Sequence, residues 1–256
     1  MGMVRTLIIR APGTNCDVET AFAFQQAGAV VSLVHINQLI GGDTKLSDYQ
    51  IMVVPGGFTY GDDIAAGKVL ANELRLKLGK DILRFIENGK LILGICNGFQ
   101  VLVKAGILPE PANGSPPRLT LATNDSGKFE CRWVHLSVNK ESPCIFTKGI
   151  DSMYLPVAHA EGKVVAKPEV LPQLNIVLYY ADEHGNNKAG YPYNPNGSVS
   201  NIAGICDSSG RIFALMPHPE RHIRGTQNPQ WTRHGAKKYG DGFQIFQNAV
   251  KWAQGL

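Results

Sequence analysis

The stretch Leu91-Ile92-Leu93-Gly94-Ile95-Cys96-Asn97-Gly98-Phe99-Gln100 decides the fold. Its first half is an apolar run typical of a buried strand, and a helical pattern follows the Gly-x-Cys-x-Gly turn at once. This order is that of a nucleophile elbow, with cysteine where hydrolases often carry serine. The two glycines remove side chains that would crowd the turn. We therefore expect the Cys96 thiol at a helix N-terminus, where the helix dipole favours the thiolate.

The same alternation of strand and helix patterns covers the first half of the chain. Strands are expected at residues 4–9, 30–34, 51–54 and 91–95, and helices at 17–27, 68–78, 80–88 and 97–105. Asp17 is expected to cap the first of these helices. Apolar strands that alternate with helices predict a parallel sheet covered on both faces. Ligands of such sheets bind at the carboxyl ends of the strands, and Cys16, Gly56-Gly57 and Cys96 all lie at such ends.

The second half of the chain has a looser pattern that indicates antiparallel strands. These are expected at residues 131–138, 153–157, 176–180, 202–205 and 211–216, before a last helix at 242–252. The stretch Pro109–Pro117 is interpreted as a surface loop and not as a domain linker. We therefore expect one α/β domain over residues 1–256, with a mostly parallel central sheet, helices on both faces and an antiparallel extension.

Bulk composition excludes several classes of function. The chain has 256 residues and a net charge of +4, and its longest basic run is Lys237-Lys238, so no nucleic-acid footprint is expected. No apolar run approaches the roughly 20 residues of a membrane span. Five cysteines without paired spacing favour a reduced, cytoplasmic protein, and no compact ligand spacing predicts a metal site.

A cysteine nucleophile needs a base, and His218 is the first candidate. It follows the apolar strand at 211–216, in the sequence Pro217-His218-Pro219-Glu220. The flanking prolines predict an extended segment, in which residues 218 and 220 point the same way. Glu220 would then orient the imidazole as the third member of a triad. His159 has the same spacing to Glu161 and remains the alternative base.

Backbone N–H groups are the expected donors to the oxyanion that forms during catalysis. One belongs to Asn97, directly after the nucleophile. The other belongs to Gly57, because a glycine lets the peptide approach a reacting carbonyl closely.

These motifs resemble those of the class I (triad) glutamine amidotransferases, and the resemblance covers nearly the whole chain. It implies a flavodoxin-like fold and hydrolysis of glutamine to glutamate and ammonia. Cys96 would form a glutamyl thioester, His218 would transfer protons and Glu220 would orient His218. Gln100, Ser126 and Phe129 would bind the substrate. The stretches that carry the resemblance, besides the elbow and the Pro-His-Pro-Glu segment, are Gly13–Asp17, Pro55–Asp63, Asn124–Val134, Ala158–Gly162 and Asn194–Ile205.

Within that family the chain is most similar to members that serve purine biosynthesis. The resemblance implies a separate ATP- and magnesium-using synthetase subunit, which receives the ammonia and converts formylglycinamide ribonucleotide to the amidine, and a small third subunit. The chain carries no G-x-x-x-x-G-K-[ST] phosphate loop, so no cofactor is expected in it. The stretches Pro109–Pro117 and Arg224–Tyr239 look longer than the family pattern.

Three other interpretations remain open. The chain could be a stand-alone cysteine hydrolase or stress-type protein on a related fold, which would need neither Glu220 nor Gln100. It could be a binding module that kept the fold, although an intact set of Cys96, His218 and Glu220 argues against this. It could also serve a different acceptor pathway.

Overall fold

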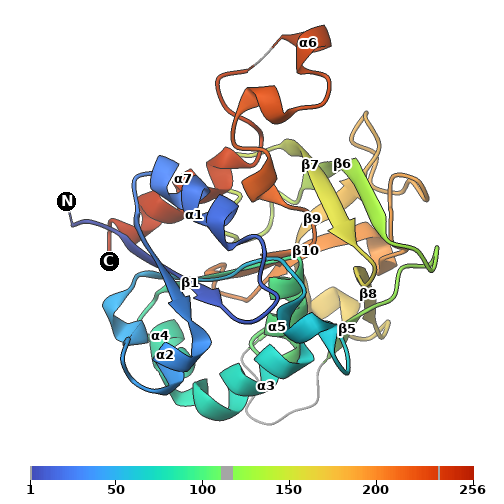
Figure 1. Ribbon diagram of the computed structural model, residues 1–256. Coiled ribbons are helices and arrows are strands. Elements are labelled where there is room, and N and C mark those ends of the chain that lie inside the picture. The colour runs from blue at the N-terminus through green and yellow to red at the C-terminus, as the bar shows by residue number, and fades with distance from the viewer. Residues whose placement is uncertain (1, 111–117, 236) are drawn as a thin grey trace.

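The chain folds as an alternating α/β unit in its first half (Figure 1). The computed structural model describes residues 2–110, 118–235 and 237–256, so most of the proline-rich stretch at 109–117 lies outside the described residues. The elements of this half are β1 (Arg5–Arg10), α1 (Asp17–Gln26), β2 (Val30–His35), α2 (Ile36–Ile40), β3 (Ile51–Val54), α3 (Lys68–Lys77), α4 (Gly79–Glu87), β4 (Leu91–Ile95) and α5 (Asn97–Lys104).

The second half contributes most of the remaining strands and the C-terminal helix. Its elements are β5 (Leu119–Ala122), β6 (Glu130–Val138), β7 (Ser152–His159), β8 (Lys163–Ala166), β9 (Asn175–Ala181), β10 (Ile202–Cys206), β11 (Ile212–Leu215), α6 (Trp231–His234) and α7 (Phe243–Ala253). Strands β5 and β8 pair with each other in a small separate sheet.

One sheet runs through the molecule in the order β2-β1-β3-β4-β11-β10-β9-β6-β7 across the described residues. The pairs from β2 through to β11 are parallel, and those from β11 through to β7 are antiparallel. The expected α/β fold, with a parallel centre and an antiparallel extension, is confirmed. Because β4 and β11 are parallel neighbours, residues that follow them, Cys96 and His218 among them, meet at one edge of the sheet.

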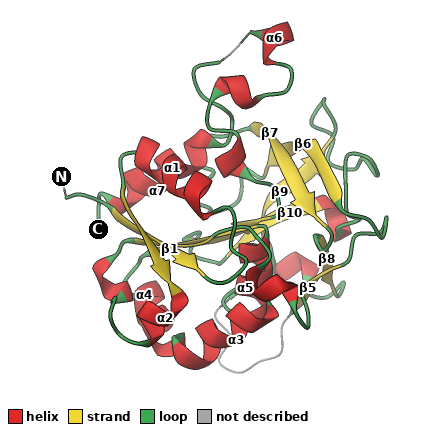
Figure 2. Cartoon of the chain, in the orientation of Figure 1, coloured by secondary structure: helices red, strands yellow, loops and turns green. Residues whose placement is uncertain are grey.

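Helices cover both faces of the parallel half (Figures 1 and 2). Helices α1 and α7 lie on one face, and α2, α3, α4 and α5 lie on the other. On the first face Phe24 of α1 packs edge-on against Phe246 of α7, with ring centroids 5.0 Å apart. The central strands β3 and β4 are fully apolar because both of their faces are buried. Within the described residues, no helix has the length and apolar character needed to cross a membrane.

Two local expectations were wrong or incomplete. Asp17 is the first residue of α1 rather than its cap, and its buried carboxylate binds Arg10 at 2.7 Å. Helix α2 was not expected. It begins after His35, whose imidazole accepts a hydrogen bond from the Asn37 N–H at 3.3 Å, and histidine is not among the usual capping residues.

Candidate active site

Cys96 occupies a strained turn between β4 and α5. Its φ of 50° and ψ of −104° lie where side chains other than glycine are rarely found. Its N–H donates to the Leu215 carbonyl of β11 at 2.8 Å, and its carbonyl accepts from the Phe99 N–H at 2.9 Å. The residue is 5% exposed, and its Sγ atom lies 3.7 Å from the Ala158 carbonyl oxygen. The surrounding strands thus hold Cys96 in a conformation that the chain would not adopt by itself.

The two elbow glycines are required by close packing. A Cβ on Gly98 would lie 1.9 Å from the Val54 carbonyl oxygen at the end of β3. A Cβ on Gly94 would lie 2.7 Å from Leu102 and 2.9 Å from the Gly98 carbonyl oxygen. Helix α5 can therefore begin directly against β3 and β4 only because these positions lack side chains.

His218 and Glu220 form a buried pair beyond the end of β11. The Nδ1 atom of His218 lies 2.6 Å from Oε1 of Glu220, and the two residues are 1% and 2% exposed. The segment is not extended as the prolines suggested. His218 is extended, but Pro219–Arg221 forms a 3₁₀ turn, and this turn brings the carboxylate back to the ring. The spacing of two residues thus predicted the pairing of His218 with Glu220, but a 3₁₀ turn and not an extended segment produces it.

The electrostatics of His218 suit an acid–base group. Burial alone lowers the pKa of His218, but the charges of Glu220 and Cys96 raise it well above the ordinary value. Its Nε2 atom is buried and has no hydrogen-bond partner among the described residues. One ring nitrogen is therefore fixed by a carboxylate, and the other is free for a reacting group.

His159, the alternative base, lacks such a carboxylate. Its Nδ1 atom lies 3.2 Å from the Asn124 side-chain oxygen, and burial, followed by the charge of His218, lowers its pKa to about 4. Glu161 turns away from it, because its side chain lies 4.0 Å from Lys104 and its carbonyl accepts from Gln100. The geometry therefore favours His218 as the base and leaves His159 neutral near pH 7.

The two predicted oxyanion donors have free N–H groups. The N–H of Asn97 belongs to the first turn of α5, where helices leave donors unpaired. Gly57 has a φ of +146°, and a Cβ there would lie 2.8 Å from the Asn15 nitrogen. Among the residues the structure describes, no acceptor pairs with either N–H. Their assignment as oxyanion donors stays a prediction.

The predicted substrate residues fall into two groups. Gln100 is buried on α5, where its amide accepts from Asn97 at 2.9 Å and donates to the Glu161 carbonyl. These bonds use one acceptor position and one N–H of the amide, so one of each remains for another partner. Ser126 and Phe129 are exposed on the loop between β5 and β6, and the Phe129 ring lies 6.4 Å from that of Phe58. These three roles also stay predictions.

Two residues near His218 and Glu220 were given no role from the sequence: Cys16, which was placed only at a strand end, and Arg221. Cys16 is 1% exposed and accepts a hydrogen bond from Nη2 of Arg221 at 3.1 Å. Potential ligand atoms of Cys16, His218 and Glu220 lie within 4.8 Å of one another, which makes them the one metal-capable group found among the described residues. A guanidinium already lies against this thiol, and the His218–Glu220 bond uses two of the ligand atoms, so the set fits a hydrogen-bonded network better than a cation site. The one sequence feature that could have indicated Arg221 as a residue near the site is its position directly after Glu220.

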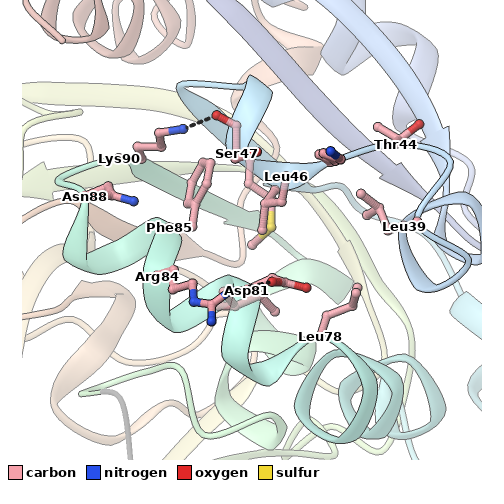
Figure 3. A pocket seen from close by; sticks show the side chains of 14 residues that line it. Leu39, Thr44, Leu46, Ser47, Leu78, Asp81, Arg84, Phe85, Asn88 and Lys90 are labelled. Atoms are coloured by element: carbon pink, nitrogen blue, oxygen red, sulfur yellow. Dashed lines mark hydrogen bonds and ion pairs between the residues drawn. The ribbon is translucent and has the colours of Figure 1, made fainter.

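A separate cavity lies far from this chemistry (Figure 3). It has a volume of about 370 Å³ and is lined by Leu46, Leu78, Phe85 and Lys90, among others. Lys90 precedes β4 at its amino end, and it donates to the Ser47 carbonyl across the cavity. Since Cys96 follows the carboxyl end of the same strand, this cavity is not the substrate site.

Fold and site together define an α/β protein with a cysteine on a strained strand–helix turn and a buried histidine–carboxylate pair at the same edge of the sheet. The chain belongs to the CobB/CobQ-like glutamine amidotransferase family, whose pattern it matches over residues 3–253. It is a glutamine amidotransferase.

The relatives it matches are of similar length. It is 59% identical over 254 residues to the phosphoribosylformylglycinamidine synthase subunit PurQ of Dehalococcoides mccartyi, covering 99% of both chains. It is 44% identical to the PurQ subunit of Archaeoglobus fulgidus, covering 99% of this chain and 98% of the relative. A chain in the structure of PurLQS from Thermotoga maritima superposes with a TM-score of 0.75 at 34% identity, covering 98% of this chain and 99% of that one.

Proposed function

We propose that this chain is the glutaminase subunit of phosphoribosylformylglycinamidine synthase. The observation that carries the proposal is the buried His218–Glu220 pair, in which Nε2 of His218 is free. This pair lies at the same edge of the sheet as the Cys96 elbow. The relatives that share nearly the full length of the chain carry the name of that subunit, which supports the choice of pathway.

The first half of the proposed reaction forms a thioester. The Cys96 thiolate attacks the side-chain amide carbon of glutamine, and the carbonyl electron pair moves to oxygen. The N–H groups of Gly57 and Asn97 bind that oxyanion. When the C–N bond breaks, His218 gives its proton to the departing nitrogen, and ammonia leaves.

The second half returns the enzyme to its starting state. His218, now neutral, takes a proton from water as the oxygen attacks the glutamyl thioester. The C–S bond breaks, glutamate leaves and the thiolate–imidazolium pair is restored. Glu220 keeps Nδ1 of His218 protonated in both halves, so that Nε2 exchanges the proton.

The acceptor of the ammonia is proposed to be a PurL-type synthetase subunit, with a small PurS subunit in the assembly. The similar chain from Thermotoga maritima belongs to a structure of PurLQS, which supports an assembly of this kind. In this proposal ATP and magnesium bind the synthetase, and the chain itself needs no cofactor. A cytoplasmic location belongs to the same proposal, and the five free cysteines are in keeping with it.

Three exposed apolar side chains, on the segment after Gly57 and on the loop before β6, are proposed to bind the synthetase and are called the lip here. Ile64 is 88% exposed, and Phe58 and Phe129 are 44% and 50% exposed. Phe58 directly follows the proposed oxyanion residue Gly57, and the adjacent Thr59 hydroxyl donates to the Asn97 side chain at 2.7 Å. A synthetase bound on this lip would therefore contact the segment that carries one proposed oxyanion donor.

The test is a reconstituted complex of the chain with the synthetase and small subunit of the same genome. Amidine formation is measured with glutamine and, separately, with ammonium chloride as nitrogen source. Cys96→Ser should abolish the glutamine-dependent rate and keep the ammonia-dependent rate, while Cys144→Ala, at a buried cysteine far from the site, should keep both. Loss of both rates in an intact Cys96→Ser complex, or survival of the glutamine-dependent rate, contradicts the proposal.

A further inference from the structure

The segment Gly13–Asp17 contacts the proposed oxyanion residue directly, although the mechanism above assigns it no role. Thr14 forms an isolated antiparallel bridge with Gly57. The Phe58 N–H donates to the Gly13 carbonyl at 3.0 Å, on the far side of that bridge. A Cβ on Gly13 would lie 2.0 Å from the Phe58 carbonyl oxygen, so the two segments are packed backbone to backbone.

Cys16 controls the orientation of the peptide that joins Gly56 and Gly57. The Gly56 carbonyl accepts from the Cys16 N–H at 3.2 Å and from the Asn15 N–H at 3.5 Å. That peptide bond is trans, and in a trans peptide the C=O and N–H point in opposite directions. Fixing the Gly56 oxygen therefore fixes the direction of the Gly57 N–H, which is the group proposed to bind the oxyanion.

The side chain of Cys16 reaches the other half of the site. Its thiol donates to the Asn15 side-chain oxygen at 3.0 Å and accepts from Nη2 of Arg221. Nε of the same guanidinium donates to the Glu19 carboxylate at 2.7 Å. Sγ also lies within 4.8 Å of a His218 ring nitrogen and a Glu220 carboxylate oxygen.

Gly56 leaves room for this contact. A Cβ at that position would lie 2.9 Å from Cε1 of His218 and 3.0 Å from Sγ of Cys16. The imidazole and the thiol therefore pack together against the peptide that carries the oxyanion donor.

We propose that Cys16 is a positioning residue that holds the Gly57 N–H and the His218–Glu220 pair in one fixed arrangement. Its backbone sets the oxyanion donor, and its thiol, anchored by Arg221, supports the imidazole. Burial raises the pKa of the Cys16 thiol, which keeps it neutral and able to donate and accept at once. Cys16 does not react with substrate. The inference rests on the proposed function, since it assigns a role in glutamine hydrolysis.

The experiment compares Cys16→Ala, Cys16→Ser and Cys144→Ala in the reconstituted complex. Glutaminase kcat, KM and the pH profile of kcat are measured, together with the free energy of unfolding. Cys16→Ala should lower kcat by roughly 10–100-fold with little change in KM, because small displacements of catalytic groups cost about that much. The neighbouring Cys16 side chain is among the groups that raise the pKa of His218, so its removal should also move the alkaline limb of the profile to lower pH.

The matched control separates positioning from stability. Cys144 is a free, buried cysteine next to the amino end of β11, so Cys144→Ala should weaken folding without moving kcat or the alkaline limb. Cys16→Ser keeps a donor and an acceptor on a shorter side chain, so its kcat and alkaline limb should lie between those of wild type and Cys16→Ala. If Cys16→Ala is insoluble, the comparison of Cys16→Ser with wild type decides.

The inference is overturned if the Cys16 variants keep the wild-type kcat and alkaline limb, or lose activity only in proportion to stability with the limb unmoved. A wild-type complex that does not hydrolyse glutamine overturns the proposed function instead.

Discussion

Replacing His159 with glutamine should remove an acid sensitivity of the folded chain. Burial and the charge of His218 lower the pKa of His159 to about 4, whereas an unfolded histidine has a pKa of about 6.5. Below a pH of about 6.5, His159 binds a proton in the unfolded chain but stays neutral in the folded chain, so the folded state loses stability as the pH falls. From these two pKa values, the free energy of unfolding should fall by about 2 kcal/mol between about pH 7 and about pH 5. His159→Gln should not show this loss.

The measurement is urea unfolding of wild type and His159→Gln at both pH values. The difference in unfolding free energy between the two proteins should change by about 2 kcal/mol with pH in the direction that favours the variant in acid. His184→Gln, at a side chain that is 83% exposed, should leave the wild-type pH dependence in place. Parallel pH dependences for wild type and His159→Gln refute the reasoning, because His159 would then titrate alike in both states.

Three further predictions concern the site and its supports. Glu220→Gln should lower glutaminase kcat by roughly 10²–10⁴-fold. It should also move the alkaline limb of the pH profile to lower pH, since the Glu220 charge raises the pKa of the His218 imidazole. An unmoved limb would contradict this effect of the Glu220 charge on the pKa of His218. Gly98→Ala should reduce the free energy of unfolding, measured in urea, by about 1–3 kcal/mol, because its Cβ would overlap with Val54. Gly79→Ala has open space around it and should stay within about 0.5 kcal/mol of wild type. Ile64→Asp should weaken synthetase binding roughly tenfold or more in a surface-binding assay without altering unfolding, and unchanged affinity would exclude this lip as the interface.

The sequence predicted the parallel half of the fold well because its signals are local. Apolar strands, the Gly94 and Gly98 turn and the helices around them each lie within one short stretch, and β3 was located to the residue. The strands of the antiparallel half were found, but their order was not, because pairing between distant strands leaves no local mark. The short sheet of β5 and β8 was missed for the same reason.

The site shows the same division between local and distant information. The His218–Glu220 pair was predicted from adjacent residues, although a 3₁₀ turn and not an extended segment brings them together. The support that Cys16 gives was not foreseen, since its contact with Arg221 joins residues 205 positions apart. The bonds of the Gln100 amide to Asn97 and to the Glu161 carbonyl were likewise not foreseen, because the sequence does not place the Glu161 segment near α5; the substrate role of Gln100 stays a prediction.

The most direct test of the account is to identify the residue that carries the glutamyl group. The reconstituted complex is mixed with glutamine, quenched in acid during turnover and digested, and the peptides are analysed by mass spectrometry. The account predicts a glutamyl thioester on Cys96 that is absent from Cys96→Ser and still forms on Cys96 in Cys16→Ser. A glutamyl group on Cys16, or turnover of glutamine by Cys96→Ser, would contradict it.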